Sequence, residues 1–187
     1  MKIGLFGGSF NPIHNSHIKI INEVLRQGLV DEIWVIPCYN HNFGKELVSF
    51  DERAMMVSLA FENIANVKLC DIEKELAGIT RTYDTISELK KRFDHEFFWI
   101  CGSDCVQDFA KWYRAEDLAR EIKFIVYSRE GFDVDTDSLM DIETVLNVQA
   151  DNVSSSDVRA RIKNDEDVSR LIPKEVLEYT NKMGLYR

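Results

Sequence analysis

The sequence GGSFNPIHNSH, residues 7–17, carries the strongest structural signal in the chain. It follows a short apolar run, residues 3–6, which predicts a buried strand closed by two glycines. After it, apolar residues recur at helical spacing from Ile18 to Leu25, so we expect a helix that begins close to His17. A strand, a glycine turn and a helix N-terminus together present free backbone N–H groups and a positive dipole end, which suit an anion such as phosphate.

Two histidines stand at the expected helix start. His14 and His17 lie three positions apart, so they can share one face of the helix and point at the same anion. An imidazole can donate a hydrogen bond to a phosphate oxygen whether it is neutral or charged. The alternative is a helix-capping turn with two incidental histidines, and a strand, a pair of glycines and a helix, taken alone, slightly favour that alternative.

The composition is typical of a soluble globular protein with one domain. The chain has 187 residues, of which 45% are hydrophobic and 29% charged. No stretch approaches the roughly 20 apolar residues of a membrane span. Gly7 and Gly8 interrupt the first apolar run, so the start does not resemble a signal peptide, and we expect a cytoplasmic protein with no membrane partner.

The charge and the cysteines exclude other classes. A net charge of −9 without a basic block argues against a nucleic-acid partner, and it requires local basic groups to hold any anionic substrate. The four cysteines form no C-x-x-C pair, so we expect free thiols. A zinc site could be drawn from Cys38, His41, Cys101 and Cys105, but their spacing does not favour it, and we expect no metal held by the protein.

Strands alternate with helices along the chain. We expect strands at 32–37, 67–70, 97–101 and 123–127 and a last one at 145–148. Ser49 to Glu52 reads as a capping box, Thr82 as a helix N-cap, and the last helix has Pro173 in its first turn and Gly184 after its end. The acidic run 130–143 is expected to be a solvated loop. This alternation predicts an α/β fold, a parallel sheet with helices on both faces, whose ligands bind beyond the carboxyl ends of the strands.

A second anion-binding segment lies near the other end of the sequence. Ser154, Ser155 and Ser156 precede a helix expected at 157–163, so three hydroxyls can join its backbone N–H groups in binding phosphate. Arg159, on the first turn, adds a guanidinium that can bind phosphate with two hydrogen bonds. The alternative is an N-cap with a surface arginine. Two such helix starts in one chain are jointly more specific than either alone.

Both segments resemble motifs of one superfamily. Residues 7–17 resemble the GG(S/T)F(D/N)PxHxGH signature of the nucleotidylyltransferases, with Ser16 where that family usually has glycine. Residues 153–159 resemble the (I/V)SS(T/S)xxR motif with which the superfamily holds the β- and γ-phosphates of ATP. The resemblance implies a Rossmann-like nucleotidylyltransferase fold, with residues 1–187 forming a single domain.

Other segments resemble one branch, the nicotinate (or nicotinamide) mononucleotide adenylyltransferases. Lys45 and the R-A-M-M sequence that starts at Arg53 look like that family's lysine loop and RxxM helix. The segment 80–86 resembles its SYTxDTL stretch, with Arg81 in place of the tyrosine. The Gly-x-Asp after the fourth expected strand and a following tryptophan match its adenosine and pyridine contacts, and the C-terminal segment 171–186 also looks like the family's ending.

This resemblance implies adenylyl transfer from ATP to a pyridine mononucleotide in NAD biosynthesis, with release of pyrophosphate. The implied catalytic residues are His14, His17, Lys45 and Arg159. Those implied for ATP are Gly8, Ser9, Phe10, His14, His17, Gly102, Asp104, Ser154, Ser155, Ser156 and Arg159. Those implied for the mononucleotide are Ser9, Lys45, Thr82 and Trp112. Mg²⁺ would bridge phosphate oxygens through few protein ligands.

Three alternatives stay open at this point. The acceptor could be nicotinate or nicotinamide mononucleotide, since Arg81 and the separated His41 and Lys45 both fall in the recognition region. A related enzyme of the superfamily could use another acceptor, such as pantetheine phosphate. A nucleotide-binding sensor without catalysis is the third reading, supported by Ser16. The oligomeric state, including a homo-oligomer, is not determined by the sequence.

Overall fold

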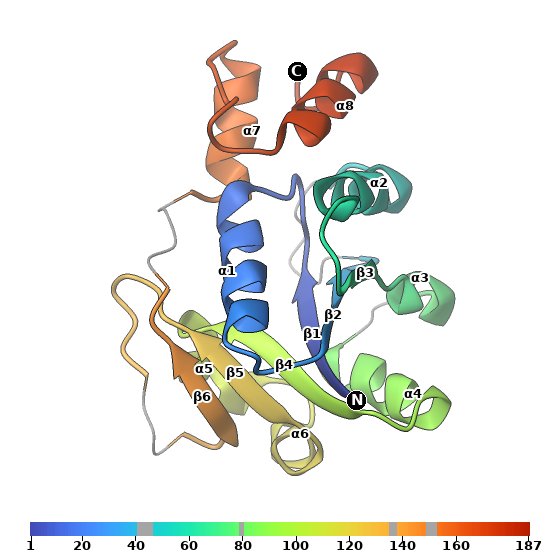
Figure 1. Ribbon diagram of the computed structural model, residues 1–187, viewed down its shortest axis with the longest axis vertical. Helices are drawn as coiled ribbons and strands as arrows, with labels where there is room; N and C mark the ends of the chain where they lie inside the picture. Colours follow the sequence, from blue (N-terminus) through green and yellow to red (C-terminus); the bar gives the residue numbers. More distant parts are fainter. Residues whose placement is uncertain (41–46, 79–80, 135–137, 149–152) are drawn as a thin grey trace.

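The computed structural model describes residues 1–40, 47–78, 81–134, 138–148 and 153–187. Within these ranges the strands form one parallel sheet in the order β3-β2-β1-β4-β5-β6 (Figure 1). The strands are β1 Lys2–Gly8, β2 Glu32–Pro37, β3 Val67–Leu69, β4 Glu96–Gly102, β5 Lys123–Tyr127 and β6 Ile142–Leu146. The chain order reverses between β1 and β4, so this parallel α/β sheet has its ligand-binding switch point there. The predicted fold class is confirmed.

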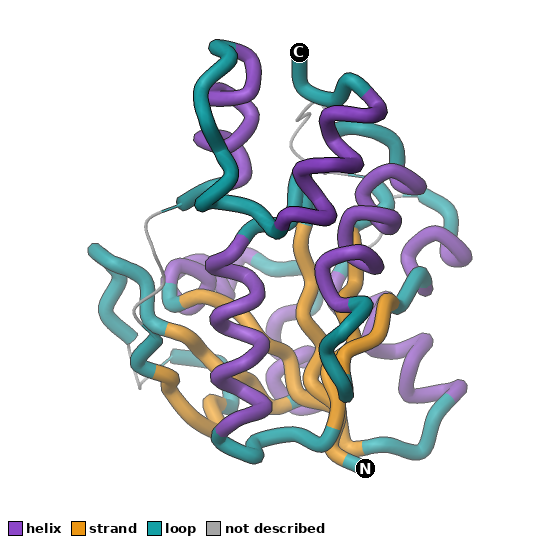
Figure 2. Tube along the Cα trace, turned by 45° about the horizontal axis from the view of Figure 1, so that its top comes forward, coloured by secondary structure: helices purple, strands orange, loops and turns teal. Residues whose placement is uncertain are grey.

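Helices cover both faces of the sheet. One apolar cluster joins the sheet to α1 Asn15–Arg26, α2 Phe50–Phe61, α7 Ser155–Lys163 and α8 Lys174–Met183. The other joins it to α3 Ile72–Leu76, α4 Thr82–Arg92, α5 Asp104–Asp108, the 3-10 turn η1 Phe109–Lys111 and α6 Ala115–Glu121. The ends of the chain lie at opposite ends of the molecule, with α7 and α8 beyond the carboxyl ends of the strands (Figure 2). No helix in the described ranges is both long and apolar enough for a membrane crossing.

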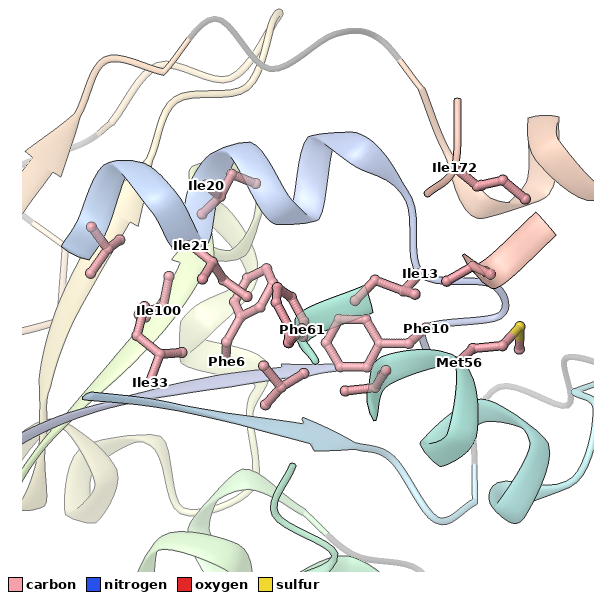
Figure 3. Close-up of a cluster of buried hydrophobic side chains, with 14 of the residues drawn as sticks. Phe6, Phe10, Ile13, Ile20, Ile21, Ile33, Met56, Phe61, Ile100 and Ile172 are labelled. Carbon is pink, nitrogen blue, oxygen red and sulfur yellow. The ribbon is translucent and has the colours of Figure 1, made fainter. Parts of the chain in front are cut away.

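Alternation along the strands divides the core between the two faces. Leu5 of β1 packs toward α4 and α6, whereas the next residue, Phe6, packs toward α1. The cluster around Phe6 continues past the end of β1, because Phe10 and Ile13 are also fully buried between α1 and α2 (Figure 3). These apolar side chains fix the course of the segment that carries the two histidines.

Most helix ends agree with the local signals in the sequence. The Ser49 capping box is confirmed, since Ser49 N–H donates to Glu52 Oε2 at 2.8 Å and Glu52 N–H donates to Ser49 Oγ at 3.2 Å. Gly184 ends α8 with a φ of 64°. The prediction for Thr82 was wrong by one position, because Arg81 has the extended backbone and its carbonyl accepts from Thr85 N–H at 3.1 Å.

The last strand was also misplaced. β6 begins at Ile142, inside the acidic run that was expected to be a loop, and ends at Leu146 rather than Val148. Its pairing with β5 sets these bounds, and Glu143 and Val145 are its exposed residues. Glu143, for example, accepts from Lys123 Nζ at 2.7 Å.

Candidate active site

A cavity of about 1250 Å³ opens at the carboxyl ends of β1, β4 and β5. Nearly all of the predicted site residues line it, from both ends of the sequence. They are Gly8, Ser9, Phe10, His14, His17, Gly102, Asp104, Trp112, Ser154, Ser155, Ser156 and Arg159. Thr82 is not among the described residues that line it, and Lys45 lies outside the residues that the structure describes. The two predicted anion-binding segments therefore face one cavity.

Direct hydrogen bonds join these two segments. Ser155 Oγ donates to the Pro12 carbonyl at 2.8 Å, and Arg159 Nη1 donates to the Asn11 carbonyl at 2.9 Å. The hydroxyl of Tyr186, near the C-terminus, donates to Asn11 Oδ1 at 2.8 Å. The start of α7 is therefore clamped against the turn that follows β1.

The three serines have different surroundings. Ser154 is the N-cap of α7 and accepts from Asp157 N–H at 3.1 Å, so its oxygen satisfies the helix end. Ser155 is used in the clamp to Pro12. Ser156 Oγ lies 3.3 Å from Arg159 Nη2, and this pair faces the cavity. Because the first N–H groups of a helix lack partners within it, the start of α7 also offers backbone donors there.

The two histidines form a stacked pair at the start of α1. Their ring centroids are 3.7 Å apart with an interplanar angle of 26°. His14 is the N-cap, and its backbone N–H donates to His17 Nδ1 at 3.2 Å. An accepting Nδ1 places the proton of a neutral imidazole on Nε2. His17 is therefore held as an Nε2–H donor.

Both imidazoles are neutral at ordinary pH. Burial lowers the pKa of His14 to about 4, with a further lowering by the positive charge of Arg129 and an opposing effect of Asp157. Burial also holds the pKa of His17 well below its ordinary value, assisted by His14 and Arg129. His14 Nδ1 is buried and has no hydrogen-bond partner within the described residues. Such an atom next to the His17 donor fits a site that a ligand completes.

The lowered pKa of His14 predicts a pH-dependent stability. The folded pKa is about 4 and the ordinary value is 6.5, so between these values the unfolded chain binds the proton more tightly and stability falls as the pH falls. Between pH 7 and pH 5 we expect the wild type to lose about 2 kcal/mol more unfolding free energy than His14→Gln. Urea unfolding of both proteins at the two pH values measures this difference. Equal losses would contradict it.

At the end of β4 the side chains of Asp104 and Arg129 pack against Gly102. Arg129 Nη1 donates to Asp104 Oδ2 at 3.0 Å. A β-carbon at Gly102 would fall on Asp104 Oδ1 and would lie 2.9 Å from Arg129 Nε. Gly102 is therefore required by the close approach of this pair.

Gly102→Ala is expected to displace the Asp104–Arg129 pair while leaving the fold intact. The atoms that the new methyl group meets are the ends of side chains that can move toward solvent. Displacing them should weaken the binding of ATP, the nucleotide that the sequence motifs imply, about tenfold or more. Calorimetric titration with ATP measures the affinity, and thermal unfolding serves as the control for the fold. Wild-type affinity in the variant would show that the position of the Asp104–Arg129 pair has no role in ATP binding.

Two arginines are more important to the site than the sequence indicated. Arg53 matched only a family helix, yet it is fully buried and joins the turn after β1 to both described ends of the connection between β2 and α2. It donates to the carbonyls of Ser9 at 2.9 Å, Val48 at 3.1 Å and Tyr39 at 3.3 Å. Arg129 lines the cavity but belongs to no predicted motif. Its place directly after the fifth expected strand, at the same sheet edge as the glycine turn, is the signal that could have found it.

The chain is similar to proteins of one kind. The model of the cytidylyltransferase-like family matches residues 5–161. A Bacillus subtilis protein named nicotinate-nucleotide adenylyltransferase is 37% identical, covering 99% of this chain and 98% of the relative. A Bacillus pumilus protein named as a probable nicotinate-nucleotide adenylyltransferase is 40% identical over the same shares.

Solved structures show the same similarity. Plasmodium falciparum nicotinic acid mononucleotide adenylyltransferase complexed with NaAD superposes with a TM-score of 0.87 and 27% identity, over 99% of this chain and 97% of that one. A putative nicotinate-nucleotide adenylyltransferase from Vibrio parahaemolyticus superposes with a TM-score of 0.76 at 21% identity, over 100% and 95% of the two chains, and supports the fold alone.

Proposed function

Because the chain belongs to the cytidylyltransferase-like family, among the nicotinate-nucleotide adenylyltransferases, we propose that it transfers the adenylyl group of ATP to nicotinate mononucleotide. It is a nucleotidyltransferase of NAD biosynthesis. The observation that carries the assignment of its site is the clamp between the histidine segment and the start of α7, which brings two sets of phosphate donors to one cavity.

The reaction joins two phosphates. A phosphate oxygen of the mononucleotide attacks the α-phosphorus of ATP, the bond from that phosphorus to the oxygen bridging to the β-phosphorus breaks, and pyrophosphate leaves with the bonding electrons. Such in-line transfer needs little covalent help, so positioning and charge neutralisation supply the catalysis. The cavity lining, rich in hydrogen-bond donors, suits this chemistry.

The geometry supports a role for each segment. His17 Nε2–H and the neighbouring His14 imidazole would donate to the transferring phosphate, which gains charge in the transition state. Arg159, Ser156 and the first N–H groups of α7 would hold the leaving pyrophosphate. Asp104 Oδ1, buried without a partner in the described part of the chain, would accept from a ribose hydroxyl.

Mg²⁺ is proposed as part of the substrate. The described residues contain no group of three or more metal-ligating side chains. Mg²⁺ keeps most of its ligands as water and phosphate oxygens, so a cation that arrives on the ATP polyphosphate needs few protein ligands. Its role there would be to neutralise charge on the phosphates.

The acceptor side of the cavity is less completely described. Trp112 lines the cavity and would stack on the pyridine ring, because a flat aromatic face suits a cationic ring. Ser9 lines the cavity at the turn after β1, where it can bind the acceptor as well as ATP. The proposed contacts of Lys45 and Thr82 with the mononucleotide, the cytoplasmic location and the oligomeric state stay predictions.

One assay separates the candidate functions. Pyrophosphate release is measured with ATP and Mg²⁺ and, side by side, nicotinate mononucleotide, nicotinamide mononucleotide or pantetheine phosphate, with a reaction lacking acceptor as the control. We expect release to be fastest with nicotinate mononucleotide. Faster release with another acceptor would reassign the substrate, and ATP binding without release would favour the nucleotide sensor.

A further inference from the structure

Arg129 lies at the wall of the cavity, and its backbone is hydrogen-bonded on both sides. It stands two positions after the end of β5. Its backbone N–H donates to Ser103 Oγ at 2.9 Å, and its carbonyl accepts from Phe132 N–H at 3.2 Å. These two hydrogen bonds hold the Arg129 backbone at the edge of the sheet and so set the position of its Cα atom.

The guanidinium of Arg129 faces both a partner and the cavity. It donates from Nη1 to Asp104 at 3.0 Å and from Nη2 to the Tyr127 hydroxyl at 3.4 Å. About half of its side-chain surface stays exposed, and the residue lines the cavity. A guanidinium has five donors in a planar fork, so a contact with one carboxylate leaves it able to bind an anion as well.

The charges around the cavity give this arginine particular weight. Among the described lining residues the cationic side chains are Arg129 and Arg159, against the carboxylates of Asp104, Glu130 and Asp157. The whole chain carries a net charge of −9. A polyphosphate that enters this cavity therefore meets an unfavourable field unless both arginines bind it.

We propose that Arg129 is a second polyphosphate-binding residue, which donates to the phosphates of ATP from the end of β5 while Arg159 does so from α7. This inference rests on the proposed function and adds a residue to it. Arg129 and both histidines line the same cavity, and the positive charge of Arg129 contributes to the lowered pKa of His14 and of His17. A phosphate bound by the two imidazoles would therefore be attracted by this guanidinium.

A role of Arg129 in orienting Asp104 alone predicts different effects on ligand binding from a role in binding phosphate. If Arg129 only orients Asp104, its loss would affect the adenosine part of ATP, since Asp104 is the acceptor at that end of the site. If Arg129 binds phosphate, its loss would affect any ligand with a polyphosphate and leave adenosine unaffected. Adenosine and inorganic tripolyphosphate are therefore the two probes that separate these roles.

The test compares Arg129→Gln with Arg120→Gln by calorimetric titration with ATP, tripolyphosphate and adenosine. Arg120 is a matched control, because it lies on α6 outside the cavity lining and pairs with Glu116 and Asp117 at the surface. For Arg129→Gln we expect ATP and tripolyphosphate to bind about 10- to 100-fold more weakly, as for the loss of a charged hydrogen bond, and adenosine to bind as before. Arg120→Gln should match the wild type with all three ligands.

Several outcomes would overturn the inference. Unchanged ATP affinity in Arg129→Gln would exclude a phosphate contact. An equal loss of ATP and adenosine affinity would assign Arg129 to the orientation of Asp104 alone. If the wild type and Arg129→Gln bind ATP equally well, only this inference is contradicted. If the wild type itself fails to bind ATP, the proposed function is contradicted too.

Discussion

His17→Ala is expected to lower the turnover number by a factor of about 10²–10³, the usual effect of removing one preorganised donor to a developing negative charge. The expectation follows from the hydrogen bond that His17 Nδ1 accepts from His14 N–H, which leaves Nε2–H as the group that can reach the transferring phosphate. The measurement is pyrophosphate release at saturating ATP and mononucleotide. Thermal unfolding should show that the variant is still folded.

His95→Ala is the matched control for this experiment. His95 lies beside Trp34, Phe93 and Phe97 next to the start of β4, at the end of the strands away from the cavity. The same imidazole-to-methyl change there should leave the turnover number unaltered. A His17→Ala enzyme with the wild-type turnover number would remove His17 from the mechanism.

Arg159→Ala is expected to lower kcat/KM for ATP by a factor of about 10²–10³, since it removes the charged hydrogen bonds that we propose Arg159 makes to the leaving pyrophosphate. Arg159→Lys keeps the positive charge but loses the planar fork, so we expect an intermediate value. Initial rates at varied ATP and saturating mononucleotide measure both variants. The KM for the mononucleotide should stay unchanged, because Arg159 lies at the ATP end of the proposed site.

Arg161→Ala provides the matched control on the same helix. Arg161 is two residues further along α7, half exposed, and lies 3.7 Å from Glu166 in a surface ion pair. Its loss should not affect kcat/KM, because exposed ion pairs contribute little even to stability. If Arg159→Ala and Arg161→Ala behave alike, α7 does not bind ATP as proposed.

Most of the sheet could be predicted because β1, β2, β4 and β5 consist mainly of apolar residues. The bounds of β2 and β5 agree with the expected 32–37 and 123–127. β6 was misplaced because it is an edge strand whose extent depends on pairing with β5, which no local pattern encodes. The five-residue helices α3 and α5 were not predicted, since they are too short to show an apolar period.

Some residues of the candidate site could be predicted from the sequence and others could not. The histidines and the start of α7 could be found because a motif marks each one, and the structure brings them to one cavity. The roles of Arg53 and Arg129 depend on tertiary contacts, although the position of Arg129 after the fifth expected strand already indicates the edge of the sheet that carries the site. The environment of Arg53 combines the carbonyl of Ser9, 44 positions away, with those of Tyr39 and Val48 in the connection that precedes α2. Arg129 precedes an acidic run that carries no pattern. Contacts of this kind depend on the tertiary fold.

The clamp between α7 and the turn after β1 also has a consequence for biosynthesis of the protein. Ser155 reaches Pro12 across 143 positions, and Arg159 reaches Asn11 across 148. On the ribosome, the glycine turn emerges early, yet the residues that complete it emerge only after most of the chain has been translated. A nascent chain that has not reached α7 lacks Ser156 and Arg159, so the proposed site is complete only in molecules of which most has been translated.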